Sequence, residues 1–155
     1  MDAFDQACSA AISHIGFSVY SSGKIKKYLL NKGYDIDIAA DVVSSLIERG
    51  YIDDFKAAGQ VLLFRKGKKR ESREFSRKRL IEAGIDPDVA YDVVSDLPSD
   101  ERSVVELFDA SLPAVVDEDV LDDLRKKSLI LAARRGFSFE CAQKGYEIWL
   151  HNRHN

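Results

Sequence analysis

Residues 34–46 read YDIDIAADVVSSL and residues 85–97 read IDPDVAYDVVSDL, each directly after a glycine, at positions 33 and 84. In this register an aspartate, an alanine, two adjacent valines and a leucine recur at a spacing of 51 residues. A third glycine, Gly136, begins a weaker copy 52 residues after the second, in which Trp149 takes the place of the leucine. Self-similarity at one period is typical of repeat proteins. The sequence therefore predicts three copies of one unit.

Each copy has the apolar spacing of amphipathic helices. The clearest stripe lies near the N-terminus, where apolar side chains recur three and four positions apart, at Phe4, Ala7, Cys8, Ala11, Ile12 and Ile15. Glycines mark helix ends, and capping residues such as Asp35, or Pro87 at a first helical position, mark helix starts. On these signals we expect helices at residues 4–15, 22–32, 35–49, 54–66, 72–83, 86–97, 100–111, 119–135 and 138–152.

These helices predict an all-α fold. We expect three tandem three-helix repeats, at residues 1–52, 53–98 and 99–155, which form an elongated array with room for curvature. Units of this size are near the lower limit for an independent hydrophobic core, so neighbouring repeats are expected to support one another modestly. Such an array offers surface in place of a deep pocket, which favours binding of macromolecules. We expect the chain to act as a monomer.

The sequence favours a cytoplasmic location. Its two cysteines, Cys8 and Cys141, lie far apart and have no spacing typical of a disulfide framework or a zinc knuckle. The first residues are acidic and amphipathic, unlike a secretory leader, and no run of eighteen uncharged apolar residues occurs. We therefore predict neither export nor membrane insertion.

Charge is distributed unevenly along the chain, although the formal net charge is only −3. Residues 65–81 hold nine basic and two acidic side chains, a net charge of +7. Residues 86–124 hold thirteen acidic side chains and one arginine, a net charge of −12, and residues 125–155 return to +5. Positive charge thus recurs on the second predicted helix of each repeat. The acidic stretch is either solvated helical surface or a docking site for a partner.

The basic block is the candidate binding site. Arg70, Arg73 and Arg77 are spaced three and four positions apart, so one helix would carry them on one face. Such a row can neutralise phosphates without reading bases, and an ordinary solvated face is the alternative. The residues predicted to bind nucleic acid or a nucleoprotein filament are Lys66, Lys68, Lys69, Arg70, Arg73, Arg77, Lys78, Arg125, Lys126, Arg134 and Arg135.

Three stretches carry a family resemblance. Residues 21–34 (SSGKIKKYLLNKGY), 46–55 (LIERGYIDDF) and 134–139 (RRGFSF) resemble the RecX family in order and spacing. The chain departs from the family pattern at Phe55, which directly follows the double aspartate, and at Gly23, where a larger helix former is common. Residues 97–124 show little that matches, so contacts made there do not transfer.

The resemblance implies a regulator of the RecA recombinase. Members of the RecX family bind the RecA filament on single-stranded DNA and restrain strand exchange, ATP hydrolysis and co-protease activity, within homologous recombination, DNA repair and the SOS response. For this chain it implies RecA filaments as the partner, with weak binding to single-stranded DNA alone. It implies no catalytic residues, cofactor or metal.

Other chemistry is poorly supported by the sequence. Adjacent helical residues such as Asp53 and Asp54 point about 100° apart, so helix capping is preferred to a metal or acid-base pair. The histidines at 151 and 154 lack a third ligand, and His14 is expected at the surface. The aromatic residues Phe139, Tyr146 and Trp149 are expected to pack in the core in preference to stacking on bases.

Two functions therefore stay open, and the chain is predicted not to be an enzyme. The first is a non-catalytic modulator of RecA filaments. The alternative is an autonomous nucleic-acid-binding protein without sequence preference. The two functions differ in which partner supplies the binding free energy. Tight and steeply salt-dependent binding to naked DNA would favour the second function.

Overall fold

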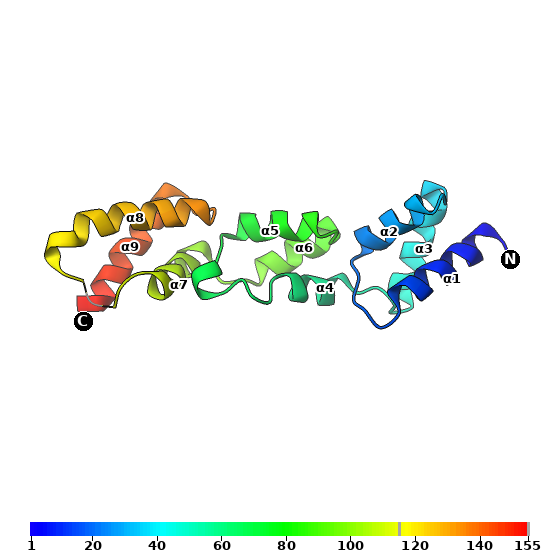
Figure 1. The fold of residues 1–155 in the computed structure, drawn as a ribbon, viewed down its shortest axis with the longest axis horizontal. Coiled ribbons are helices and arrows are strands. Elements are labelled where there is room, and N and C mark those ends of the chain that lie inside the picture. The colour runs from blue at the N-terminus through cyan, green and yellow to red at the C-terminus, as the bar shows by residue number, and fades with distance from the viewer. Residues whose placement is uncertain (115, 155) are drawn as a thin grey trace. The chain divides into compact units, whose positions relative to one another are not determined.

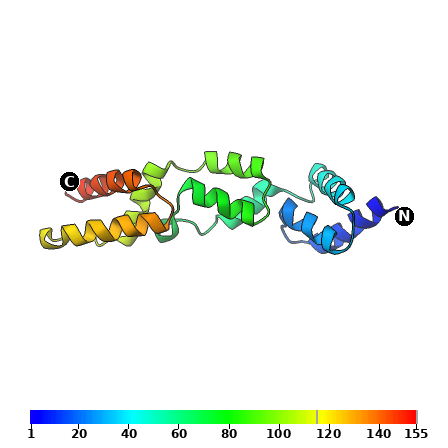
Figure 2. The same ribbon diagram turned by 90° about the horizontal axis from the view of Figure 1, so that it is seen from above.

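The computed structural model describes residues 1–114 and 116–154, and that part of the chain is helical without a strand. The all-α prediction is confirmed. Figures 1 and 2 show the order of the elements along the chain. The α-helices are α1 (Ala3–Ile15), α2 (Ser22–Asn31), α3 (Ile36–Glu48), α4 (Asp54–Val61), α5 (Arg73–Glu82), α6 (Pro87–Ser95), α7 (Asp100–Ser111), α8 (Leu121–Arg134) and α9 (Phe139–His154). Two 3-10 turns, η1 (Gly67–Lys69) and η2 (Glu118–Val120), precede α5 and α8.

Glycines end the second helix of each predicted copy in the same way. Gly33, Gly84 and Gly136 have φ values of 94°, 87° and 88°, a region that L side chains rarely adopt. Beyond each glycine the next backbone N–H donates to a carbonyl five positions earlier, from Tyr34 to Leu29, Ile85 to Leu80 and Phe137 to Ala132. This hydrogen bond, between residues five positions apart, is the longer-range of the two bonds that form a Schellman cap. The predicted helix ends at these glycines are confirmed.

The prediction for α4 is wrong at its C-terminal end, because a helix was expected to continue to Lys66. The helix stops at Val61 and a turn follows, in which the Arg65 N–H donates to the Leu62 carbonyl at 3.0 Å. Ala57 and Ala58 are buried, whereas Leu63 and Phe64 are exposed. Burial of side chains therefore does not stabilise a further helical turn after Val61.

The chain divides into two compact units. Unit 1 comprises residues 1–61 with 79–93, and unit 2 comprises residues 62–78 with the chain from 94 onward. Helices α5 and α6 each cross the boundary between them. The grouping into three repeats of 1–52, 53–98 and 99–155 remains a prediction.

Each unit has its own hydrophobic cluster. In unit 1, α1, α2 and α3 bury Ala11, Ile25, Leu29, Val42 and Leu46 completely. In unit 2, α7, α8 and α9 bury Val104, Leu107, Phe108, Ala132 and Trp149 completely. Trp149 thus lies in a core, as Leu46 does, which confirms the predicted packing of that side chain.

One aromatic residue was misplaced by the sequence prediction. Phe139, expected in the core, is 63% exposed at the first turn of α9, whereas Phe137 is buried. Phe137 occupies the position after Gly136, where the cap turns its side chain into the cluster. Tyr146 is buried as predicted, and its ring lies 5.9 Å from that of Trp149. Burial raises the pKa of the Tyr146 hydroxyl, which donates to the Leu121 carbonyl.

Candidate nucleic-acid interface

The start of α5 is fixed in unit 2 by contacts from distant segments. The Arg73 N–H donates to the Asp100 carboxylate at 2.9 Å, and the Ser72 N–H donates to the Arg135 carbonyl at 2.9 Å. The Ser72 hydroxyl accepts from the Phe75 N–H, as a helix N-cap does. Buried donors at this helix start are therefore satisfied by α7 and by the end of α8.

Unit 1 repeats this arrangement around the start of α2. The Ser22 N–H donates to the Asp54 carboxylate at 2.7 Å, and the Ser21 hydroxyl donates to the Ala83 carbonyl at 2.7 Å. Ser21 and Ser22 lie 51 residues before Ser72 and Arg73, so the two junctions agree with the predicted repeat spacing.

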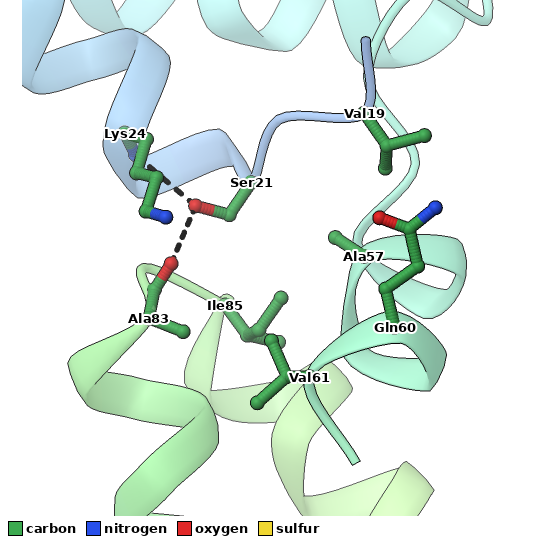
Figure 3. Close-up of a pocket in the computed structure, with 8 residues that line it drawn as sticks. All are labelled: Val19, Ser21, Lys24, Ala57, Gln60, Val61, Ala83 and Ile85. Carbon is green, nitrogen blue, oxygen red and sulfur yellow. Dashed lines mark hydrogen bonds between the residues drawn. The ribbon is translucent and has the colours of Figure 1, made fainter. Parts of the chain in front are cut away.

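A small cavity of about 220 Å³ lies beside the unit 1 junction (Figure 3). Ser21 and Lys24 line one side of it, and the Ser21 hydroxyl is already engaged by Ala83. The remaining lining is formed by Val19, Ala57, Gln60, Val61, Ala83 and Ile85. This lining brings few polar groups together, so the cavity has little of what catalysis requires.

The chain between α4 and α5 forms a basic loop, defined here as residues 65–70. Glu106 of α7 accepts from the Gly67 N–H at 2.9 Å and from Arg70 Nε at 2.6 Å. These two hydrogen bonds, with that from Arg70 first, hold the pKa of the Glu106 carboxyl below its usual range, against a smaller opposing effect of burial. Gly67 has a φ of 57°, so the turn suits glycine.

The end of α8 holds the same loop from a second side. The Arg135 guanidinium donates to the Lys68 carbonyl at 3.0 Å, while the Arg135 carbonyl accepts from Ser72. Arg134, the last residue of α8, is exposed. The structure therefore brings Arg135 against the loop that carries the lysines, a proximity that sequence spacing does not reveal.

The predicted row of arginines on one helix face is wrong. Helix α5 begins at Arg73, so Arg70 lies outside it. The Arg73 guanidinium donates to the carbonyls of Leu97 and Pro98, where α6 has ended, and Arg70 is paired with Glu106. Both side chains are occupied by internal partners. Arg73 donates to carbonyls left without donors at the end of a helix, and Arg70 donates to a carboxylate of α7.

The remaining α5 cations are at the surface. Arg77 pairs with Glu74 at 2.7 Å, and this hydrogen bond lowers the pKa of Glu74 and raises that of Arg77. Lys78 lies 3.9 Å from the same carboxylate. Such exposed pairs are weak and open readily to a competing anion.

The lysines of the basic loop are its available cations. Lys66, Lys68 and Lys69 are all exposed, and the Glu106 carboxylate that holds the loop is engaged by Arg70 and Gly67. Arg125 and Lys126 lie at the opposite end of α8, nine residues or about 13 Å from Arg134. Lys126 is 3.8 Å from Asp122. The predicted site residues thus fall at the loop, on the surface of α5 with Arg77 and Lys78, and on α8 with Arg125 and Lys126.

The double aspartate has two structural roles. Asp53 accepts from the backbone N–H groups of Phe55 and Lys56, which confirms the predicted capping of α4. Asp54 is buried and accepts from Ser22 and from the Asp86 N–H. Within the described ranges no cluster of three or more histidine, cysteine or acidic side chains could hold a metal ion. No helix in the same ranges is long and apolar enough to cross a bilayer.

No protein-family model matches the chain. Curated relatives do: it is 26% identical over 143 residues to a protein named regulatory protein RecX from Leuconostoc citreum, and 24% identical over the same length to one from Leuconostoc mesenteroides subsp. mesenteroides. These alignments cover 92% of this chain but 54% of each relative, so the chain spans about half the length of these proteins.

A solved structure has the same fold. The crystal structure of RecX from Lactobacillus salivarius matches with a TM-score of 0.67 at 14% sequence identity, over 96% of this chain and 97% of that one. Together with the curated relatives, this match confirms the family resemblance predicted from the sequence.

Proposed function

From this resemblance to RecX proteins in both sequence and fold, we propose that the chain is a non-catalytic regulator of a RecA recombinase. It binds the RecA filament on single-stranded DNA in the cytoplasm, as a monomer, and restrains strand exchange, ATP hydrolysis and co-protease activity. The chain would thereby act in homologous recombination, DNA repair and the SOS response. The observation that carries the proposal is the similarity of both fold and sequence to RecX proteins. A basic loop that is hydrogen-bonded to Glu106 and Arg135 supports it.

The charge distribution supports a partner that contains both DNA and protein. Lysines of the basic loop suit phosphates, which are the strongest anions on a nucleoprotein filament. Exposed acidic side chains, among them Asp88, Asp92 and Asp96, would be repelled by phosphates and suit a basic protein surface. A partner that has both components would use both kinds of surface.

The test is the ATPase rate of RecA on single-stranded DNA, measured with substoichiometric amounts of this protein. We expect a clear fall in rate. The triple variant Lys66→Gln, Lys68→Gln, Lys69→Gln should lose most of it. A matched control with Lys27→Gln, Lys56→Gln and Lys144→Gln removes the same charge from other exposed positions and should keep it. No effect of the unaltered protein, even in excess over a cognate RecA, would reject the proposal.

A second function is favoured by the loop itself. Three exposed lysines whose local carboxylate is already engaged could bind nucleic acid without any recombinase. Binding to naked single-stranded DNA and to RecA filaments should be compared over a salt series. Equal affinity for both would favour the autonomous binder, and a large preference for the filament favours the regulator.

A further inference from the structure

Two large apolar side chains lie exposed directly before the basic loop. Leu63 is 52% exposed and Phe64 is 75% exposed, in the turn that ends α4. Contact between a phenylalanine ring and water is unfavourable, and an exposed ring adds nothing to the stability of the fold. Phe17 is also fully exposed, but it has no lysine or arginine within six positions on either side. Phe55 and Phe139 are exposed too, but Phe64 is the exposed phenylalanine that three lysines follow within five residues, at Lys66, Lys68 and Lys69.

Phe64 directly precedes a loop that is held by two other elements. Glu106 binds the loop through Gly67 and Arg70, and Arg135 binds the Lys68 carbonyl. A loop that is already ordered loses less conformational entropy when it binds a ligand. The aromatic ring and three ammonium groups thus share one ordered surface segment.

We propose that Phe64 stacks on an unpaired base of single-stranded nucleic acid whose phosphates contact Lys66, Lys68 and Lys69. An aromatic face beside cations is the combination by which proteins bind single strands without reading their sequence. Phe64 lies two residues from Lys66 and five from Lys69, so their Cα atoms are at most about 7 Å and 18 Å apart. This span fits a few nucleotides.

The site is selective for single strands on physical grounds. In a duplex the base faces are covered by their neighbours, so a ring on the protein surface gains no stacking there. An acidic protein segment could also meet the lysines, but it would gain from any apolar side chain at position 64 and not specifically from an aromatic one. The inference rests on the proposed function only in identifying the strand as the DNA of a RecA filament.

The test uses Phe64→Trp and an oligo(dT) probe, without RecA. Trp149 is the one native tryptophan and is fully buried, so emission changes on binding report the new side chain. We expect oligo(dT) to quench this emission and to bind Phe64→Trp at least as tightly as the native protein. Phe64→Ala and Phe64→Leu should bind roughly 5- to 150-fold more weakly. Phe17→Ala is the matched control and should bind normally.

An abasic oligonucleotide separates stacking from charge. It retains the phosphates, so the native protein and Phe64→Ala should bind it equally, with a salt dependence that the triple lysine variant reduces. Unquenched emission, or native affinity of Phe64→Leu for oligo(dT), would overturn the proposal. The RecA ATPase assay is independent of this result. Quenching without any effect on RecA would reject the proposed function alone, and inhibition without quenching would reject the stacking site alone.

Discussion

At the scale of single residues, the charged side chains that matter for the fold are those with buried partners. Asp54 is buried and its carboxylate accepts from the Ser22 N–H at 2.7 Å, the Ser22 hydroxyl at 2.5 Å and the Asp86 N–H at 2.8 Å. These donors belong to the starts of α2 and α6. One carboxylate therefore satisfies two helix N-termini within unit 1.

Replacing Asp54 by alanine should destabilise the protein by about 3 kcal/mol, because buried donors lose a charged acceptor. The free energy of unfolding in urea measures this. Asp53→Ala is the matched control, since Asp53 is exposed and caps only its own helix, and it should cost about 1 kcal/mol. Equal losses for the two variants would contradict the role assigned to Asp54.

Glu106 gives a pH-dependent prediction. Its pKa is lowered in the folded protein, first by the hydrogen bond from Arg70. A lowered folded pKa means that the carboxylate stabilises the protein above the unfolded pKa of about 4.3, and that this contribution is lost as pH falls through the folded value. The Glu106 side chain is 42% exposed, so solvent screening limits the effect.

The variant Glu106→Gln should therefore be less stable than the native protein at pH 7 by about 1 kcal/mol or less. The difference should shrink once the pH falls below the unfolded pKa of about 4.3, because protons then bind the unfolded carboxyl before the folded one. Urea unfolding at pH 7, 5 and 3.5 measures it. A difference that stays constant over this range would show that the charge of Glu106 is not its source.

The sequence could predict the local role of Asp53 and not the role of Asp54. A cap acts on backbone two and three residues ahead, as Phe55 and Lys56 show, so its pattern is visible in the sequence. Asp54 binds residues 32 positions away on either side. The role of Glu106 could not be predicted for the same reason, because Glu106 lies 36 residues from Arg70.

At the scale of elements, the start of α2 lies close to the glycine turn at Gly84. A Cβ atom built on Gly84 would lie 2.4 Å from the Ser21 hydroxyl oxygen and 3.0 Å from the Lys24 nitrogen. A Cβ atom on Gly33, whose φ of 94° is similar, would meet nothing within 4 Å. The two glycines therefore share a backbone conformation and differ in their surroundings.

Gly33→Ala should cost about 1 to 2 kcal/mol, for the left-handed backbone alone. Gly84→Ala should cost about 1 to 3 kcal/mol more, because the start of α2 must also move. Thermal or urea unfolding of both variants provides the comparison. Similar losses would mean that the contact between Gly84 and α2 adjusts without cost.

Helix boundaries were predictable where capping residues and glycines mark them. The structure of the basic segment at residues 65–81 was not. The row of Arg70, Arg73 and Arg77 assumed a single helix face, but α5 begins at Arg73 after its cap Ser72, so Arg70 lies in the loop before it. Spacing along the chain also cannot show that Arg73 satisfies carbonyls at the end of α6. Charge density singles out this segment as a candidate site, but it could not separate arginines that have internal partners from exposed lysines.

At the scale of the whole molecule, the two units have separate cores and share two helices. Gly84 lies in unit 1, whereas Gly136 lies in unit 2, where a Cβ atom would meet the Phe75 ring and the Ser72 hydroxyl at 2.5 Å. Helices α5 and α6 contribute residues to both units. We therefore expect a disturbance in either unit to affect the amides of these two helices.

Hydrogen exchange in a crossed pair of variants tests this coupling. Gly84→Ala should speed amide exchange in α1, α2 and α3 and leave α8 and α9 close to the native rates, because local opening follows cooperative units. Gly136→Ala should do the reverse, and amides of α5 and α6 should respond to both. The two variants match in residue change and in left-handed φ, at 87° and 88°. If each variant instead speeds exchange throughout the chain to the same extent, the molecule opens as one cooperative unit, and the shared helices couple the two cores more strongly than their separate packing implies.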